Sequence, residues 1–362
     1  YELVDNKELK DPGKMWEPDF AKTHPDFVHH FGEYGAARVP RMLSRASHIS
    51  DMSNPSIEVL SEATQIGAAE FYQILSDKMQ INYPVTTGIM PWVFKRQWPI
   101  IAIQFMDWFG HANAPYYFLK STYEPLHVAI DLPRLLWAPG ESIDLNAKVL
   151  KLPTFSAPEG SKLMVCVYDD TFKLMAQKEG KPSDSSQESV SSVNLGAFKI
   201  PEDYKDRFLF VLAELRSPQG KVLSRSLYYP RSLAKMQDPS FFNSYVNEAL
   251  PWITFEKGPW LKPVVEKSRA TIDVSGLKIR KAAATGESKI SVSVRNTGAV
   301  PAFMTTLDVT GVKRAAVATD NFFWLAPGEV KKIEIDVLWR EDSSNALLQV
   351  KAWNASPVLM KL

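Results

Sequence analysis

Apolar residues alternate with polar ones in short runs from residue 126 onward, and this period of two restricts that part of the chain to β-sheet structure. One run begins at Leu126 and another at Ile143, with a Pro139-Gly140 turn between them. Further strand-like runs follow at 163–168, 190–198, 208–214 and 221–229. About seven short strands separated by turn residues are typical of an immunoglobulin-like sandwich, which we predict here.

The C-terminal part of the chain shows the same alternation of apolar and polar residues, with a different sequence. Alternating apolar residues recur at 290–294, 333–339 and 348–352 and predict a second all-β sandwich. The segment from Asp320 to Glu329 is predicted to be a strand that ends in a turn. Residues 233–262 are rich in aromatic residues and proline, and we expect them to connect the two sandwiches.

The region before residue 122 has a different pattern. Asn54 and Pro55 supply a cap and a first-turn proline, and apolar residues then recur at helical spacing from Ile57 to Leu75. Residues 86–94 form an apolar run of strand length, and a second helix is predicted to begin near Asn113. This order of strands and helices indicates a βα-type fold.

Composition excludes several classes of protein. The 362 residues carry a formal net charge of +1, which argues against a nucleic-acid-binding protein. Cys166 is the only cysteine, so an intrachain disulfide is impossible, and its apolar surroundings predict a buried, inert thiol. No run approaches the ~18 apolar residues of a membrane span. The first residues resemble neither a signal peptide nor an initiation site, and we expect the chain to be cut from a longer protein.

Most catalytic motifs are missing from the sequence, which has no phosphate-binding loop, dinucleotide fingerprint, zinc-protease motif or nucleophile elbow. His24, His29 and His30 lack the spacing of a strong metal site, and we expect structural roles for them. No metal and no cofactor are therefore predicted. Glu33 lies between Gly32 and Gly35 after a strand-like apolar run, a setting that suits a catalytic carboxylate at a barrel mouth but is weak on its own.

A resemblance strengthens this interpretation. The run from Gly32 to Gly35, with Val39-Pro40 after it, is similar to the signature around the nucleophile of family 2 glycoside hydrolases, especially the β-mannosidase and exo-β-glucosaminidase branch. Four further motifs follow in that branch's order: Gly88 to Trp92 with Trp98-Pro99, Asp107 to Gly110, Ala114 to Lys120 with Tyr123 to Pro125, and Asp320 to Glu329. The resemblance covers nearly the entire chain.

The resemblance implies a multidomain fold: the C-terminal part of a TIM (β/α)8 barrel followed by two immunoglobulin-like sandwiches. The corresponding domains are 1–122 for the barrel part, 123–232 and 263–362 for the sandwiches, and 233–262 for the connector. It also implies a retaining exo-β-glycosidase in which Glu33 is the nucleophile. The family's acid/base is a Glu that follows Asn, upstream of the nucleophile. Because Asn247-Glu248 lies after the barrel region, the acid/base and the first barrel strands are expected in a missing N-terminal part, on the same precursor or a second chain.

Four residues are predicted to bind the carbohydrate substrate. Trp92 offers a flat apolar face to a sugar ring, with a barrel-core aromatic as the alternative. Trp98 suits either a sugar contact or a plug beside Pro99. Lys95 and Arg96 depart from the branch's Gln-Leu-Asn-Asp pattern, which puts plain mannoside specificity in doubt. They suit an anionic sugar, or else belong to a solvated loop or a salt bridge to the missing part.

Two further features of the sequence are Asp107 and a glycosylation sequon. Asp107 is expected to orient its loop or to cap the following helix rather than to contact substrate. Asn354-Ala-Ser356 is the only complete N-glycosylation sequon.

Other functions remain open at this point. A catalytically inactive carbohydrate-binding or scaffolding protein on the same fold is the alternative to an enzyme, and a surface adhesin fits the region before residue 122 poorly. The resemblance favours a periplasmic or extracellular location.

Overall fold

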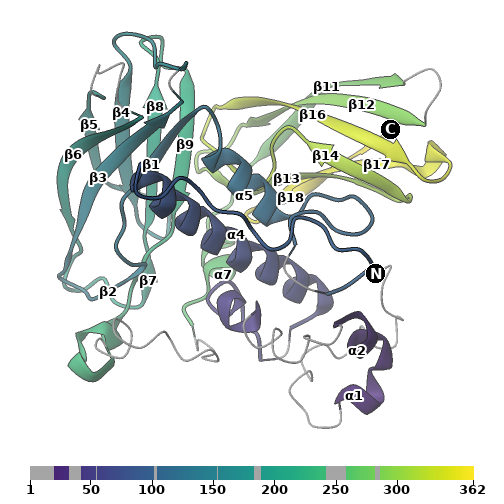
Figure 1. Ribbon diagram of the computed structural model, residues 1–362, viewed down its shortest axis with the longest axis horizontal. Helices are drawn as coiled ribbons and strands as arrows, with labels where there is room; N and C mark the ends of the chain where they lie inside the picture. Colours follow the sequence, from purple (N-terminus) through teal and green to yellow (C-terminus); the bar gives the residue numbers. More distant parts are fainter. Residues whose placement is uncertain are drawn as a thin grey trace. The chain divides into compact units, whose positions relative to one another are not determined.

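The computed structural model describes residues 20–31, 42–53, 55–101, 104–152, 154–182, 189–241, 258–281 and 286–362 (Figure 1). These residues form two compact units. The first unit contains the described residues of Tyr1–Ala69, Pro91–Tyr117 and Phe255–Leu362, and the second contains those of Glu70–Met90 and Phe118–Thr254. The boundary between the units falls inside helices α4 (Ile57–Ile81) and α5 (Ala114–Thr122).

The second unit contains the first predicted sandwich. Its sheets have the strand orders β1-β3-β6 and β5-β4-β8-β9, and all pairs in them are antiparallel. A small sheet, β2-β10-β7, lies in the same unit. The strands are β1 (Leu126–Ile130), β2 (Leu136–Trp137), β3 (Ser142–Lys151), β4 (Lys162–Tyr168), β5 (Leu174–Gly180), β6 (Val190–Lys199), β7 (Arg207–Phe208), β8 (Phe210–Arg216), β9 (Val222–Tyr228) and β10 (Arg231–Ser232).

The alternation seen in the sequence explains most of these strands. On β3, Ile143 and Leu145 are fully buried, and they pack in the core with Val165 of β4. Strand β5 was not predicted. Its side chains are exposed or half-buried along its length, so its sequence does not alternate between apolar and polar residues. Cys166 is buried as predicted, and burial raises the pKa of its thiol above the usual range.

The first unit contains the second sandwich, with sheet orders β11-β12-β16-β14 and β15-β13-β17-β18. Ile290 pairs with Ile335 between β12 and β16, and both side chains are buried in the core of this sandwich. The strands are β11 (Ile272–Lys281), β12 (Glu287–Asn296), β13 (Ala302–Thr310), β14 (Arg314–Ala318), β15 (Phe323–Leu325), β16 (Val330–Trp339), β17 (Leu347–Ala352) and β18 (Ala355–Lys361). Helix α7 (Leu261–Val265) precedes them, whereas the short helix η3 (Ala234–Gln237) belongs to the second unit.

The predicted strand and turn between Asp320 and Glu329 are present, and their polar side chains hold the turn together. Asn321 exchanges two hydrogen bonds with the backbone of Leu307 on β13, at 2.8 and 3.0 Å. A carboxylate oxygen of Glu329 accepts the N–H of Ala326 at 2.8 Å. Gly328, at a φ of 75°, takes the left-handed conformation that the turn requires.

Both predicted helices of the first 122 residues are confirmed as α4 and α5. Within the first unit, α4 lies against the helical residues 42–46 at a glycine. A Cβ atom on Gly67 would meet the carbonyl oxygen of Arg45 at 2.5 Å, so the close approach of the two backbones requires glycine here.

Two strand predictions in this region are wrong. The run before Glu33 forms helix α2 (Pro25–Phe31), preceded by α1 (Phe20–Thr23). Pro25 suits a first helical position and Asp26 suits a first turn, whereas the length of an apolar run cannot distinguish a helix from a strand. Residues 86–94 have no strand, since Pro91 lacks an N–H and no described segment forms a ladder with them. A TIM barrel is consequently not evident among the described residues.

Candidate functional site

The predicted nucleophile, Glu33, lies outside the described residues, and so do its neighbours from Gly32 to Arg41. The structure does describe the chain that leads to it. Helix α2 ends at Phe31, and its last turn carries His29 and His30. The assignment of Glu33 stays a prediction, and the surroundings of α2 are the nearest described part of the site.

The end of α2 contacts the segment that contains Trp98. The ring centroid of Trp98 lies 5.4 Å from that of His29 and 5.9 Å from that of His30. His30 forms two hydrogen bonds with the same segment. Its Nδ1 lies 2.9 Å from the carbonyl oxygen of Pro99, and its own carbonyl oxygen accepts the N–H of Ile101 at 2.7 Å. The predicted structural role of these histidines is consistent with these contacts.

The segment from Trp92 to Arg96 is irregular and partly exposed. The side chain of Trp92 is 79% exposed, so its ring is accessible to a ligand. Arg96 is half-buried, and Lys95 is exposed and forms an isolated parallel bridge with Met106. Trp92, Lys95 and Arg96 share this segment because they are close in sequence, and their contacts with substrate stay predictions.

Trp108 is a candidate that the sequence did not single out. Its side chain is 43% exposed, and the Nζ atom of Lys95 lies 5.9 Å from its ring centroid, within the range of a cation–π contact. In the sequence Trp108 belonged to a motif considered only for Asp107. The sequence could have indicated Trp108, because it is an aromatic residue directly after Asp107, which was predicted to orient the loop.

Asp107 has the loop-orienting role that was expected. Its Oδ1 accepts the backbone N–H of His111 at 2.8 Å, and its own N–H donates to the His111 carbonyl at 3.0 Å. His111 in turn contacts β14 through Nε2 and the carbonyl oxygen of Arg314 at 2.8 Å. The loop that carries Trp108 is thus fastened to the C-terminal sandwich.

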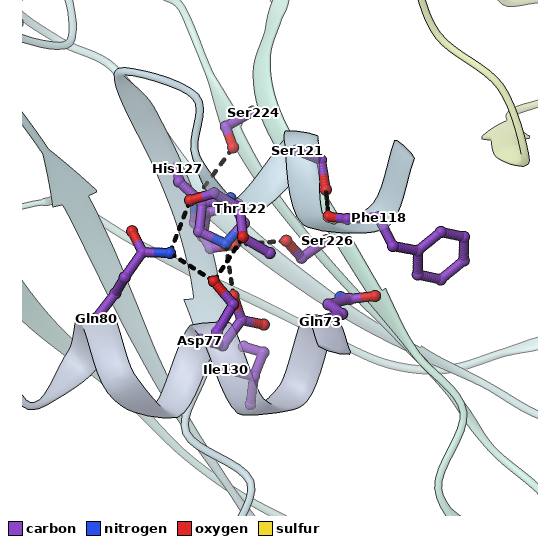
Figure 2. Close-up of polar contacts among 12 residues, drawn as sticks. Gln73, Asp77, Gln80, Phe118, Ser121, Thr122, His127, Ile130, Ser224 and Ser226 are labelled. Carbon is purple, nitrogen blue, oxygen red and sulfur yellow. Dashed lines mark hydrogen bonds and ion pairs between the residues drawn. The ribbon is translucent and has the colours of Figure 1, made fainter. Parts of the chain in front are cut away.

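A second group of polar side chains is buried in the second unit, at the C-terminal half of α4 (Figure 2). Asp77 and His127 point toward one another, and His127 Nε2 lies 2.8 Å from Asp77 Oδ1. The hydroxyl of Tyr228 donates to Asp77 Oδ2 at 2.7 Å and accepts the N–H of Ile130 at 3.1 Å. Burial raises the pKa of Tyr228 far above its usual range, so this hydroxyl is a donor at any physiological pH.

An aspartate, a histidine and nearby serines raise the question of a catalytic triad. The side chains of His127 and Asp77 are only 1% and 3% exposed, so substrate cannot reach them. Ser224 accepts the N–H of Val128 and Ser226 donates to its carbonyl oxygen, which engages both hydroxyls with strand β1. The group therefore links α4, β1 and β9 inside the unit, and its role is structural.

The glycosylation sequon is buried in the folded chain. Asn354 is fully buried, and its amide donates to the carbonyl oxygens of Ser268 at 2.8 Å and Pro301 at 2.9 Å. Its Oδ1 accepts the N–H of Phe303 at 3.0 Å. With every polar atom of the side chain engaged, Asn354 is not an acceptor for glycan in the folded protein.

The described residues contain no group of three or more His, Cys, Asp or Glu residues placed to hold a metal ion. Among the same residues, no helix combines the length and the apolar character needed to cross a bilayer.

Comparison with known proteins finds similarity to glycosidases, in the sequence of one sandwich and in the fold of most of the chain. Residues 266–355 match the sequence family described as the exo-β-D-glucosaminidase Ig-fold domain. A structure of the exo-chitosanase CsxA of Amycolatopsis orientalis with PNP-β-D-glucosamine is 16% identical, with a TM-score of 0.58, over 88% of this chain and 36% of that chain. A β-D-mannosidase of Dictyoglomus thermophilum is 15% identical, with a TM-score of 0.57, over 98% of this chain and 35% of that chain.

The chain resembles the C-terminal part of a family 2 glycoside hydrolase. At these identities the solved structures establish similarity of fold. The chain spans between 35% and 40% of the length of the enzymes it matches. A search of curated protein sequences returns no match.

Proposed function

We propose that this chain is the C-terminal part of a retaining exo-β-glycosidase of family 2, closest to the β-mannosidase and exo-β-glucosaminidase branch. The observation that carries the proposal is the agreement of two independent comparisons. The fold is shared with an exo-β-D-glucosaminidase over 99% of the chain, and residues 266–355 match the Ig-fold domain family of such enzymes. In this proposal residues 1–122 complete a TIM barrel, and residues 123–232 and 263–362 are its accessory sandwiches.

The proposed chemistry divides the work between two carboxyl groups. Glu33 attacks the anomeric carbon and forms a covalent glycosyl-enzyme intermediate, and a second carboxyl group about 5 Å away protonates the leaving oxygen and later activates water. That second group belongs to the N-terminal part of the enzyme, which is the proposed partner of this chain. The chain by itself is therefore proposed to be inactive.

Carbohydrate contacts are assigned to the segment around Trp92. An exposed indole can stack on the C–H face of a sugar ring, and 79% of the Trp92 side chain is exposed. Lys95 and Arg96 follow it and supply positive charge, so an acidic glycoside is a candidate substrate together with a β-mannoside and a β-glucosaminide. Trp98 is proposed to contact substrate with the part of its ring that the histidines leave free.

Covalent labelling tests the proposal. The complete enzyme is incubated with activated fluoro-β-glycosides, 2-fluoro for mannose and glucuronic acid and 5-fluoro for glucosamine, whose amine occupies C2, and the labelled peptide is identified by mass spectrometry. We expect the label on Glu33, and we expect Glu33→Gln to lose labelling together with turnover of the matching nitrophenyl glycoside. Glu159→Gln, in an exposed turn of the first sandwich, is the matched control and should keep both.

The outcome also separates the two classes of function. Label on another carboxylate would disprove the assignment of Glu33. A folded protein that binds these sugars but accepts no label and shows no turnover would instead be a carbohydrate-binding or scaffolding protein on the same fold.

A further inference from the structure

One residue joins the end of α2 to the Trp98–Ile101 segment at two atoms. The carbonyl oxygen of His30 belongs to the last turn of the helix, where backbone carbonyls have no partner within the helix. It accepts the N–H of Ile101 at 2.7 Å, while Nδ1 of the same residue lies 2.9 Å from the carbonyl oxygen of Pro99. The two hydrogen bonds bind residues 99 and 101 to a single residue of the helix.

The partner of the imidazole fixes the position of its proton. A backbone carbonyl oxygen can only accept, so Nδ1 of His30 must carry the hydrogen. In the neutral ring Nε2 then carries a lone pair. The structure thus specifies the Nδ1–H tautomer for His30 whenever the ring is neutral.

Trp98 lies against the two histidine rings at the same point. Its ring is inclined at 30° to that of His30, in a stacked arrangement, and at 64° to that of His29, edge to face. The two histidine rings lie 5.0 Å apart. The residue that makes both hydrogen bonds therefore also stacks on the indole.

We propose that His30 is a positioning residue, which holds the Trp98–Ile101 segment at a fixed distance from the chain that leads into Glu33. The inference rests on the proposed function, because Glu33 follows His30 by three positions and Trp98 is a proposed sugar contact. It assigns no contact with substrate to His30 itself.

Such a role has a measurable consequence for catalysis. Covalent attack on an anomeric carbon requires the nucleophile and the sugar to be held in a narrow geometry, and a displacement of about 1 Å can cost about 100-fold in rate. Without this link, the end of α2 and the Trp98–Ile101 segment can shift relative to one another, which moves the proposed sugar contact relative to the chain that leads into the proposed nucleophile. Such a shift slows the covalent step more than it weakens binding of the sugar.

The first experiment detects the link in the chain itself, without any activity. Histidine is labelled with ¹⁵N, and a long-range ¹H–¹⁵N correlation spectrum is recorded at a pH where the rings are neutral. We expect the signals of His30, assigned by their loss in His30→Asn, to show a protonated Nδ1 and an unprotonated Nε2. The opposite tautomer would overturn the proposal.

The second experiment measures the rate of covalent labelling in the complete enzyme with the activated fluoro-glycoside that labels it best. His30→Leu should lower the rate constant of labelling by about 10- to 100-fold and should change the dissociation constant of the reagent much less. His30→Asn should recover most of the loss, because its amide nitrogen can stand near the position of Nδ1 and donate to Pro99. His29→Leu is the matched control. Within the described part of the chain, His29 contacts Trp98 through its ring alone, so the loss should be smaller.

The two proposals fail in different ways. If the wild-type enzyme takes no label, the proposed function is wrong, and the positioning role falls with it even if the spectrum shows the expected tautomer. If Glu33 is labelled in the wild type but His30→Leu reacts at an unchanged rate, or His30→Asn is as slow as His30→Leu, only the positioning role is overturned. Should His30→Leu fail to fold, the comparison of His30→Asn with His29→Leu and the tautomer of the wild type still decide the question.

Discussion

Replacement of Asp77 by alanine should strongly destabilise the second unit. The carboxylate accepts a hydrogen bond from His127 Nε2 at 2.8 Å (Figure 2). It accepts a second one from the Tyr228 hydroxyl at 2.7 Å. Alanine removes both acceptors and leaves two buried donors, in side chains that water does not reach. Each unsatisfied buried donor costs about 1–3 kcal/mol, so we expect a loss of about 3–5 kcal/mol in the free energy of unfolding.

That loss is a large part of the stability of a domain, which is commonly about 5–15 kcal/mol. In urea, with a slope of about 2 kcal/mol per molar, the unfolding midpoint of this unit should fall by about 1.5–2.5 M. Hydrogen exchange locates the effect, since amides of β1, β9 and the C-terminal half of α4 should lose protection together. Asp77→Asn should cost less, because one acceptor oxygen remains.

Asp144 provides the control. It lies on β3 of the same sandwich with an exposed side chain, and Asp144→Ala should change stability by less than about 0.5 kcal/mol. The reasoning is refuted if Asp77→Ala costs no more than Asp144→Ala, or if protection is lost in strands remote from β1 and β9. In that case the buried group would be incidental to the stability of the unit.

Two further predictions concern the first unit. Asn354→Ala removes three buried hydrogen bonds and should cost about 3 kcal/mol in a urea titration; Ser356→Ala, which destroys the sequon but keeps the amide, should cost far less, and equal losses would contradict the assignment. Burial raises the pKa of Tyr117 to about 12, because the folded protein disfavours the ionised phenolate. The resulting contribution to the free energy of unfolding is at most about 3 kcal/mol, is fully present below pH 10 and is lost as the pH rises from 10 to 12. Tyr117→Phe should flatten this part of the stability profile, although it costs the hydrogen bond to Ala318, and an unchanged alkaline slope would argue against the role of Tyr117.

The sequence determined the β structure because burial of one sheet face leaves a mark at every second position. Ile143 on β3 and Ile290 on β12 belong to runs whose alternation is visible without any structure, and both are fully buried. The helix from Ile57 was equally predictable from its spacing. Strands of two residues such as β2 and β10 are too short to leave a period, and only their pairing defines them.

Tertiary structure decided the rest. Residues 25–31 form a helix although their apolar run suited a strand equally well. Residues 86–94 form no strand, because a strand needs a neighbour that the run itself cannot supply. A sequon cannot reveal that its amide is buried, as at Asn354. The same holds for His30 and Pro99 and for Asp77 and Tyr228, which lie far apart in the chain and meet only in the fold. Local patterns record which face of an element is buried, whereas hydrogen bonds between distant segments depend on how the elements pack, and no local period encodes them.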